Sequence, residues 1–326
     1  MKALDHPSYG PADVLRVVER PRPTARPGQL LVRVRAVEVT KADTELRSLR
    51  FPVGWFALPM RLAMGLRRPR RCRIGVYYAG EVVEVGEGVT RFSPGDRVFG
   101  TTGLRQSVCS EFVAVPEGAR LARLPEGVDF DAGAASLLGG LNALHFLTKA
   151  GLRAGETLLV IGAGGSIGAL AVQLGVHLGA EVTAVDVAAK RPLLERLGAQ
   201  RVLTHPEQRW GVDRAPAKGY DVILEMPARK QLARSLRALA PGGRLMIANL
   251  RSIDLLAAVF LRPGGGRRLS CAMAKESARE LERVGELLAT GALAPPIDRR
   301  LPLEAVVEAH RRVESERRRG IVLLTP

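Results

Sequence analysis

The residues with the clearest chemical meaning form a glycine-rich turn near the middle of the chain. The segment IGAGGSIGALAVQLG, residues 161–175, follows an apolar strand pattern and opens a helical one. Glycines at such a turn let the backbone approach a pyrophosphate group, which then lies at the N-terminus of the helix. The A-x-G-x-x-G spacing, in this context, predicts a dinucleotide site. The expected contact residues are Gly162, Ala163, Gly164, Gly165, Ser166, Ile167 and Gly168.

An acidic residue stands where the next strand ends. The strand pattern EVTAVD, residues 181–186, puts Asp186 18 residues after Gly168. A carboxylate there can accept a hydrogen bond from a ribose 2′-hydroxyl and would repel a 2′-phosphate. Lys190 and Arg191 lie just beyond it and could instead hold a 2′-phosphate. The pattern favours NADH over NADPH.

The turn belongs to a long alternation of apolar strands and helices. Residues 121–276 begin with a helical stretch, 129–151, and continue with strand and helix patterns through RLMIAN, residues 244–249. Uniformly apolar strands that alternate with helices predict a parallel sheet covered on both faces. Ala248 and Asn249 end the last of these strands, and strand ends of such sheets face the ligand crevice. Both are therefore candidate cofactor contacts.

The flanking regions have a different pattern. Residues 1–120 read as short strands, such as the alternating stretch 30–39, separated by Gly and Pro turns. They predict a mostly antiparallel β domain. The end of the chain contains two helical stretches, 276–289 and 303–315, and a final strand. A length of 326 residues allows about two domains.

Composition limits the class of protein. Hydrophobic residues make up 46% of the chain and charged residues 25%, which is typical of a globular protein rather than a disordered or fibrous one. Three cysteines are too few for a disulfide scaffold and indicate a reducing compartment. The N-terminus has no apolar signal core, and no segment has the ~18–20 apolar residues that span a bilayer. We therefore expect a cytoplasmic protein without a transmembrane segment.

The net charge is strongly positive, because 49 Lys and Arg residues against 33 Asp and Glu residues give +16. Arginines cluster at 67–73 and 311–319. A basic patch could bind nucleic acid, but aromatic residues are only 4% of the chain, so platforms for stacking bases are scarce. The apolar segment 48–66 before the first cluster could cap a cleft, move as a lid, lie on anionic lipid or present a solvated arginine face.

Several segments together resemble a known family. They are AGEVVEVGEGVTRFSPGDRVFG (79–100), GAGGSIGALAVQLGVHLGAEVTAVD (162–186), LAPGGRL (239–245) and IVLLT (321–325). In order and spacing they resemble the medium-chain dehydrogenase/reductase superfamily, in its zinc-independent, quinone-oxidoreductase-like branch. The resemblance covers nearly the whole chain.

This resemblance implies an α/β fold with two domains. A GroES-like, mostly antiparallel β-barrel domain would comprise residues 1–120 and be completed by 277–326. A Rossmann domain with a doubly wound parallel sheet would comprise residues 121–276. Relatives often dimerise by joining the edges of their Rossmann sheets. The strand RRLSCAMA, residues 267–274, is a candidate edge, so the resemblance implies a homodimer.

The resemblance also indicates where the ligands of a catalytic zinc would stand in this sequence. Zinc enzymes of this superfamily have a Cys after the strand near residue 39 and a His after the glycine near residue 75. Here the two stretches read VTKADTELR (39–47) and GVYYAGE (75–81), without either ligand. We therefore expect no zinc and no other metal. Without a Lewis acid, the expected hydride acceptor is a quinone or an α,β-unsaturated carbonyl.

The same two stretches are implied as walls of the substrate slot. Tyr77, Thr40 and Lys41 are the candidate catalytic residues, because each can donate a hydrogen bond to the substrate oxygen that gains charge. Relatives usually carry Asn in place of Thr40 and often Asp in place of Tyr77. Alternatively, Tyr77 and Tyr78 are packing residues on a turn, with one ring buried and the other exposed.

Two further polar positions have competing interpretations. Asn142 falls where relatives often place Thr near the nicotinamide or its phosphate, but a helix residue that bonds locally gives the same pattern. Asp43 and Arg47 are four residues apart, which suits an ion pair on one helical face. A proton shuttle is the alternative role for Asp43.

The resemblance implies a zinc-independent, NAD(P)H-dependent oxidoreductase acting on a small quinone or enone. An enoyl reductase acting on a thioester is an alternative within the same class. A different class of protein is also consistent with the sequence: a nucleotide-binding protein with little catalysis that uses its basic surface for RNA or a protein partner. Salt dependence distinguishes these classes. Nucleic-acid binding weakens steeply as the salt concentration rises, whereas turnover with a nicotinamide cofactor should not.

Overall fold

In the computed structural model, the described residues are 1–51, 54, 57–70, 74–103, 105, 107–205, 215–226, 232–248, 264–271 and 274–326. The chain divides into two compact units. Unit 1 contains residues 1–138 and 276–326, and unit 2 contains residues 139–275. The sequence suggested domains of 1–120 with 277–326, and of 121–276. The main difference is that unit 1 also takes residues 121–138, which include the start of the long helix α3 (Phe130–Ala150).

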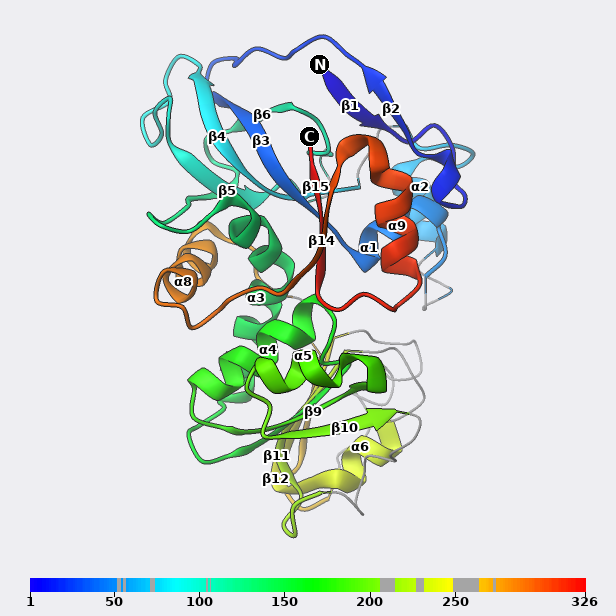
Figure 1. Ribbon diagram of the computed structural model, residues 1–326, viewed down its shortest axis with the longest axis vertical. Coiled ribbons are helices and arrows are strands. Elements are labelled where there is room, and N and C mark those ends of the chain that lie inside the picture. Colours follow the sequence, from blue (N-terminus) through cyan, green and yellow to red (C-terminus); the bar gives the residue numbers. More distant parts are fainter. Residues whose placement is uncertain are drawn as a thin grey trace. The chain divides into compact units, whose positions relative to one another are not determined.

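Unit 1 is built on a mostly antiparallel sheet (Figure 1). Its strands follow the order β14 (Ile297–Pro302), β15 (Ile321–Thr325), β3 (Gln29–Val39), β4 (Tyr77–Val85), β5 (Arg97–Thr101) and β7 (Arg120–Arg123), with β6 (Phe112–Pro116) paired to β3. Among the described pairs of this sheet, only β14 and β15 run parallel. A separate antiparallel pair joins β1 (Lys2–Asp5) to β2 (Arg16–Glu19). The expected antiparallel β domain is confirmed.

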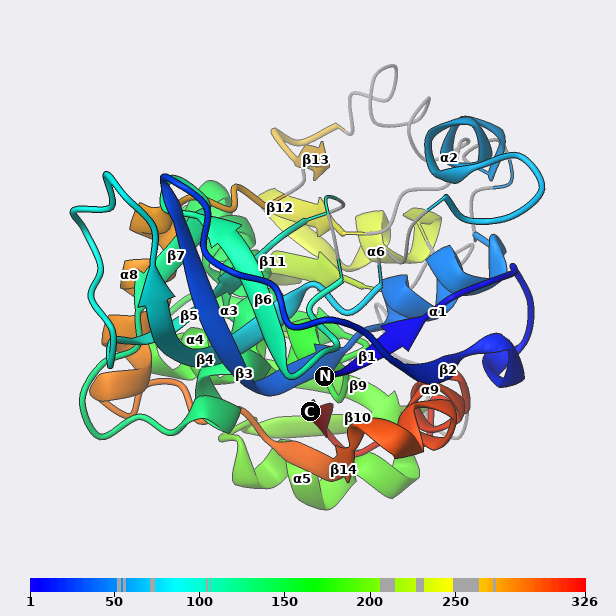
Figure 2. The ribbon, with the colours of Figure 1, turned by 90° about the horizontal axis from the view of Figure 1, so that it is seen from above.

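The long strand β3 organises unit 1, because it pairs with β15, β4 and β6. Its side chains are buried except for Gln29, which is half-buried, and Arg33 and Arg35, which are exposed. The helical elements are η1 (Ala12–Val14), α1 (Lys41–Ser48), α2 (Ala57–Met64), α8 (Ala278–Ala289), η5 (Leu303–Ala305) and α9 (Val306–Glu314). Figures 1 and 2 show α9 beside α1. One apolar core joins β3 to both ends of the chain, through residues such as Leu4, Val322 and Leu324.

Unit 2 is a parallel sheet with helical crossovers. Its strands follow the order β10 (Arg201–His205), β9 (Glu181–Val187), β8 (Thr157–Ile161), β11 (Tyr220–Glu225), β12 (Leu239–Ile247) and β13 (Arg268–Cys271). All five described pairings are parallel. This is the strand order of a doubly wound dinucleotide-binding sheet, so the sequence prediction is confirmed. The strand expected at the sheet edge, β13, is the last strand of this order.

Helices cover this sheet on both sides. They are α4 (Ser166–His177), η3 (Ala188–Lys190), α5 (Arg191–Arg196) and α6 (Leu232–Ala238). Figures 1 and 2 show α5 and α6 on opposite faces. The strands β8 and β11 are almost completely buried, which explains the apolar runs 158–161 and 222–224 within them. None of the helices in the described part of the chain is both long enough and apolar enough to cross a membrane.

Candidate functional site

The glycine turn of unit 2 connects β8 to α4. Gly162 follows β8 in a left-handed conformation, with φ of 80°, which favours glycine. A Cβ placed on Gly168 would lie 2.3 Å from the carbonyl oxygen of Gly162 and 2.6 Å from the Cα of Ala163. Such a side chain would force the backbone to move. The turn and the helix can therefore approach this closely only because residue 168 is glycine.

The N-terminus of α4 has no side-chain cap. Its N-cap residue, Gly165, cannot supply an acceptor, and the first turn contains no acidic residue. A Cβ at Gly165 would have no neighbour closer than 3.7 Å, so space is open beside it. The N–H groups at a helix start and the positive end of its dipole suit an anion. The turn therefore fits the pyrophosphate of a dinucleotide.

Asp186, near the end of β9, hydrogen-bonds to the backbone of the glycine turn. Its Oδ2 accepts a hydrogen bond from the N–H of Gly164 at 2.7 Å, and its Oδ1 accepts one from the N–H of Val187 at 2.8 Å. The Nζ of Lys190 lies 3.1 Å from the same Oδ1, and the two side chains are only 9% and 10% exposed. The carboxylate therefore fixes the glycine turn, and its negative charge is paired by Lys190.

The other predicted cofactor contacts lie in separate elements of unit 2. Arg191 begins α5, and its guanidinium lies 3.5 Å from the carboxylate of Glu195. Asn142 is half-buried on α3. Ala248 directly follows β12, and Asn249 lies outside the described residues. The structure therefore brings Gly164, Asp186 and Lys190 into direct contact but shows no contact of Arg191 with them.

In unit 1, Tyr77 begins β4 and is bonded to a residue far away in sequence. Its hydroxyl donates a hydrogen bond to Glu276 Oε1 at 2.7 Å. Arg120 of β7 pairs with the other oxygen of Glu276 at 2.5 Å. Burial, together with the negative charge of Glu276, raises the pKa of Tyr77 well above its usual value. Tyr77 is therefore a neutral phenol whose proton points to a carboxylate.

Thr40 and Asp43 form the cap of α1. The backbone N–H and the hydroxyl of Thr40 both donate to Asp43 Oδ2 at 2.7 Å, and the Asp43 N–H donates back to Thr40 Oγ1 at 3.1 Å. The N–H of Gly75 donates to Asp43 Oδ1 at 2.7 Å. Burial raises the pKa of Asp43, and these hydrogen bonds oppose the rise. The pair thus ties the start of α1 to the residues just before β4.

Two expectations about this region are wrong. Asp43 does not pair with Arg47, because its position in the capping box turns the carboxylate back toward the start of the helix. Tyr77 and Tyr78 are not divided between the core and solvent, since they are only 9% and 1% exposed. Lys41, the first residue of α1, has a half-exposed side chain whose Nζ lies 3.4 Å from Glu316.

Arg47 instead belongs to a buried basic cluster that joins α1 to α9. Its guanidinium pairs with Glu314, and its Nε and Nη1 have no hydrogen-bond partner among the described residues. Burial, with Arg47 and His6 nearby, lowers the pKa of His310 to about 3. Burial also lowers the pKa of His6, whose ring nitrogen lies 3.2 Å from the Arg47 carbonyl oxygen.

Comparison with known proteins establishes the family. Residues 26–140 match the family model of the alcohol dehydrogenase GroES-like domain, and residues 197–324 match that of the zinc-binding dehydrogenase. The quinone oxidoreductase of Lama guanicoe is 31% identical over 336 residues, which cover 95% of this chain and 92% of that protein. The chain belongs to the medium-chain dehydrogenase/reductase superfamily. Within it, the protein is quinone-oxidoreductase-like.

Solved structures agree with this membership. The quinone oxidoreductase from Coxiella burnetii has a TM-score of 0.86 and 25% identity, with 100% of this chain and 99% of that chain covered. The mycobacterial protein Rv1454c, complexed with NADPH, has a TM-score of 0.81 and 26% identity, with 100% of both chains covered. The medium-chain dehydrogenase/reductase fold, a GroES-like sheet domain and a Rossmann-like parallel-sheet domain, is therefore shared.

Two further kinds of superfamily relative differ in length. The 2-methylene-furan-3-one reductase of Solanum lycopersicum is 27% identical over 338 residues, covering 100% of this chain and 79% of that protein. The spectinabilin polyketide synthase protein NorB of Streptomyces orinoci is 35% identical over 223 residues, covering 68% of this chain. The chain spans only 9% of NorB and 8% of PikAII, the pikromycin polyketide synthase component of Streptomyces venezuelae.

Sequence reasoning missed Glu276 in this dehydrogenase-family protein. It is separated from Tyr77 by 199 residues and from Arg120 by 156 residues. It stands directly before Ser277, the N-cap of α8, whose side chain accepts a hydrogen bond from the Glu280 N–H. In sequence, Glu276 is one of several polar residues at a helix start, so no local signal marks it as a partner of Tyr77.

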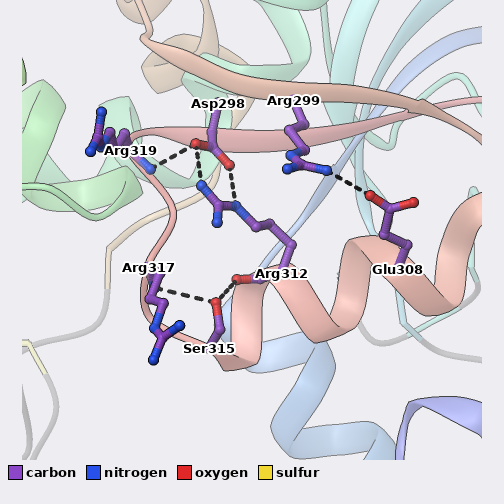
Figure 3. Close-up of polar contacts among 7 residues, drawn as sticks. All are labelled: Asp298, Arg299, Glu308, Arg312, Ser315, Arg317 and Arg319. Atoms are coloured by element: carbon purple, nitrogen blue, oxygen red, sulfur yellow. Dashed lines mark hydrogen bonds and ion pairs between the residues drawn. The ribbon is translucent and has the colours of Figure 1, made fainter.

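The second arginine cluster, residues 311–319, is largely explained by structural contacts (Figure 3). Arg312 donates to both carboxylate oxygens of Asp298, at 2.7 and 2.9 Å, and the backbone N–H of Arg319 also donates to Asp298 at 2.9 Å. Burial alone would raise the pKa of Asp298, but these bonds hold it below its usual value. Arg299 pairs with Glu308 beside this group. These arginines connect β14 to α9.

The name of one matched family model concerns zinc. Within the ranges that the structure describes, no group of three or more His, Cys, Asp or Glu side chains is placed to hold a metal ion. The expectation of a metal-free reaction stays a prediction.

Proposed function

We propose that this protein transfers hydride from a reduced nicotinamide dinucleotide to a small quinone or α,β-unsaturated carbonyl, without a metal. The observation that carries the proposal is the glycine turn, with its close contact at Gly168 and the uncapped start of α4. The relatives named quinone oxidoreductase and 2-methylene-furan-3-one reductase support both acceptor classes.

The turn residues 162–168 would hold the pyrophosphate, and Asp186 would accept a hydrogen bond from the adenosine ribose. A bound nicotinamide ring supplies the hydride in such enzymes. Asp186 supports a preference for NADH, because its carboxylate would repel a 2′-phosphate. Lys190 weakens that repulsion, since its ammonium group lies 3.1 Å from the same carboxylate. We assign Asn142, Ala248 and Asn249 to the nicotinamide end of the cofactor and Arg191 to its adenosine end.

Tyr77 is assigned to the substrate oxygen that gains negative charge. Because its pKa is raised, Tyr77 keeps its proton and acts as a hydrogen-bond donor, while the proton that completes the reduction comes from solvent. To donate to substrate, the hydroxyl must turn away from Glu276. Lys41 can add positive charge at the same side of the slot. The Thr40 hydroxyl is engaged by Asp43, so in this arrangement Thr40 acts by holding the start of α1.

One alternative acceptor is an α,β-unsaturated thioester, the substrate of the enoyl reductase that the sequence leaves open as an alternative. An acceptor screen with a p-quinone, an enone and an enoyl thioester ranks the three by kcat/KM. We expect the quinone or the enone to exceed the thioester. A higher value for the thioester would replace the proposed acceptor and leave the hydride chemistry unchanged.

Cofactor titration tests the proposal itself. Purified protein is titrated separately with NADH and NADPH while the nicotinamide fluorescence is followed. We expect both to bind and NADH to bind more tightly. Tighter binding of NADPH would mean that Lys190 and Arg191 dominate over Asp186. Binding of neither would contradict the proposal and favour the alternative of a protein that uses its basic surface for RNA or a protein partner.

We also propose a homodimer formed through the edge strand β13, as the family resemblance implies. Light scattering of the purified protein should give twice the monomer mass of 35.1 kDa. A monomeric mass at all concentrations would contradict it.

A further inference from the structure

The helix α2 of unit 1 carries the most exposed large apolar side chains among the described residues. Leu58, Leu62 and Leu66 are 63%, 57% and 59% exposed, whereas the others of this kind are 38–41% exposed. Leu58 and Leu62 are one helical turn apart, and Leu66 follows after another four residues, just beyond the helix end. Leu58 and Leu62 therefore share one face of α2, and Leu66 adds an exposed apolar side chain just after it; these three residues are the leucine strip.

The opposite side of α2 is anchored. Met60 and Met64 are 7% and 0% exposed and belong to the main core of unit 1. Positions two residues from the leucines lie about half a turn away around a helix, so the methionines and leucines occupy opposite faces. Figure 2 shows α2 at the periphery of unit 1. The packing of the methionines fixes the helix in place, and the leucine strip is left as surface.

Positive charge surrounds this strip. Arg61, Arg67, Arg68 and Arg70 are all exposed, and none of them makes an ion pair with a carboxylate of the described chain. The sequence contains no acidic residue between Glu45 and Glu81. The surface therefore combines exposed leucines with unneutralised arginines, unlike Arg311 and Arg312 of the second arginine cluster, which form ion pairs inside unit 1.

Two of these arginines also border a hollow. Arg68 and Arg70 line a cavity of about 780 Å³ together with Arg20 and Asp5, which pair with each other. Arg68 and Arg70 therefore remain as cationic donors to an anionic group near the leucine strip. An apolar strip next to a cationic hollow matches the two parts of a phospholipid, its acyl chains and its headgroup phosphate.

We propose that the strip Leu58, Leu62 and Leu66, with Arg61, Arg67, Arg68 and Arg70, is a docking surface for an anionic lipid membrane. The leucines would enter the boundary between headgroups and acyl chains, and the arginines would contact phosphates. A second copy of the chain fits less well, because a symmetric contact would set the four arginines against their own counterparts. Access to an acceptor dissolved in the bilayer would follow from docking; this consequence alone rests on the proposed function.

Vesicle binding of the full-length protein tests the surface without any activity measurement. The protein is sedimented with phosphatidylcholine vesicles that contain or lack phosphatidylglycerol, at low and at physiological salt. We expect binding to the anionic vesicles, weaker binding as salt rises, and much less binding to the neutral vesicles. Absence of binding to anionic vesicles would overturn the proposal.

Matched variants locate the surface. Leu62→Ser should weaken the partition coefficient about tenfold, whereas Ile297→Ser, at a 41% exposed position on β14, should leave it unchanged. Arg67→Ser should weaken it about fivefold, whereas Arg196→Ser, an exposed arginine of α5, should not. Equal effects of a variant and its control would contradict the assignment.

Sedimentation velocity of the same variants addresses self-association. We expect Leu62→Ser to leave the oligomeric state unchanged. If the substitution instead dissociates a dimer, the strip is an interface between copies of this chain and the membrane proposal is wrong. Reduction of a water-soluble acceptor should be the same in all four variants, because none of these residues belongs to the candidate site.

Discussion

The two candidate sites of this protein are encoded in different ways. In unit 2, the turn and the residues that close it lie within one stretch, residues 162–190, and contact one another through backbone N–H groups and short side chains. In unit 1, the bonded group around Tyr77 comes from three separated parts of the chain, represented by Tyr77, Arg120 and Glu276. A local site depends on backbone shape, whereas an assembled site depends on the packing of the whole unit.

Acidification should affect the assembled unit most strongly. Because the pKa of His310 is about 3 in the folded protein and about 6.5 in the unfolded chain, the unfolded state takes up the proton first as the pH falls below 6.5. At pH 4 this difference should remove about 3 kcal/mol from the free energy of unfolding. Urea unfolding at pH 7 and pH 4 measures the loss, and His310→Gln should lose less. Equal losses in the two proteins would contradict the role of His310.

A single added methyl group in the glycine turn of unit 2 should disrupt cofactor binding. Gly168→Ala should weaken NADH binding about a hundredfold, because the Cβ would collide with the backbone at Gly162 and Ala163. Gly118→Ala is the control, since Gly118 has open space around it and no left-handed backbone. Fluorescence titration measures both. Unchanged binding in Gly168→Ala would show that the turn does not hold the cofactor.

The assembled site should be altered from a distance. Glu276→Gln removes the charge that holds the Tyr77 hydroxyl away from the substrate, so it should raise kcat about tenfold with little change in NADH affinity. Glu280→Gln, on the first turn of α8 and bonded to Ser277, is the matched control and should retain the wild-type kcat. The raised pKa of Tyr77 should also fall in Glu276→Gln, which ultraviolet titration of the phenol can detect. If both variants behave alike, Tyr77 does not depend on Glu276.

The smallest expected effect concerns cofactor choice. Asp186→Ser removes the carboxylate that disfavours a 2′-phosphate and leaves Lys190 without its counter-ion. The ratio of the NADPH and NADH dissociation constants should shift about fivefold toward NADPH. Glu181→Ser, at the exposed start of the same strand β9, is the control and should leave the ratio unchanged. A shift toward NADH in Asp186→Ser would contradict the assignment of Asp186.

This contrast also explains what the sequence could predict. The parallel sheet of unit 2 and the glycine turn between β8 and α4 followed from apolar strands, helix patterns and glycine spacing, because each of these signals is local. The expected pair of Asp43 with Arg47 was wrong, since helical spacing alone does not reveal a capping box that turns the carboxylate toward Thr40 and Gly75.

Other features could not be found without the folded unit. The link from Tyr77 to Glu276 joins the first and last parts of unit 1, and neither residue has a local partner that marks it. The ion pairs of the second arginine cluster could not be predicted either. Arg312 meets Asp298 only because the folded unit brings α9 and β14 side by side. Long-range pairing of charges leaves no periodic signal in a sequence.

The central claim is that hydride passes directly from the bound nicotinamide to an unsaturated acceptor without a metal. The most direct test uses NADH deuterated at C4 on each face in turn, an enone acceptor and an excess of metal chelator, with the product examined by nuclear magnetic resonance. We predict that deuterium from one face appears at the β-carbon of the product and that the chelator does not change the rate. Deuterium absent from the product for both faces, or a reaction that stops with the chelator, would contradict the claim.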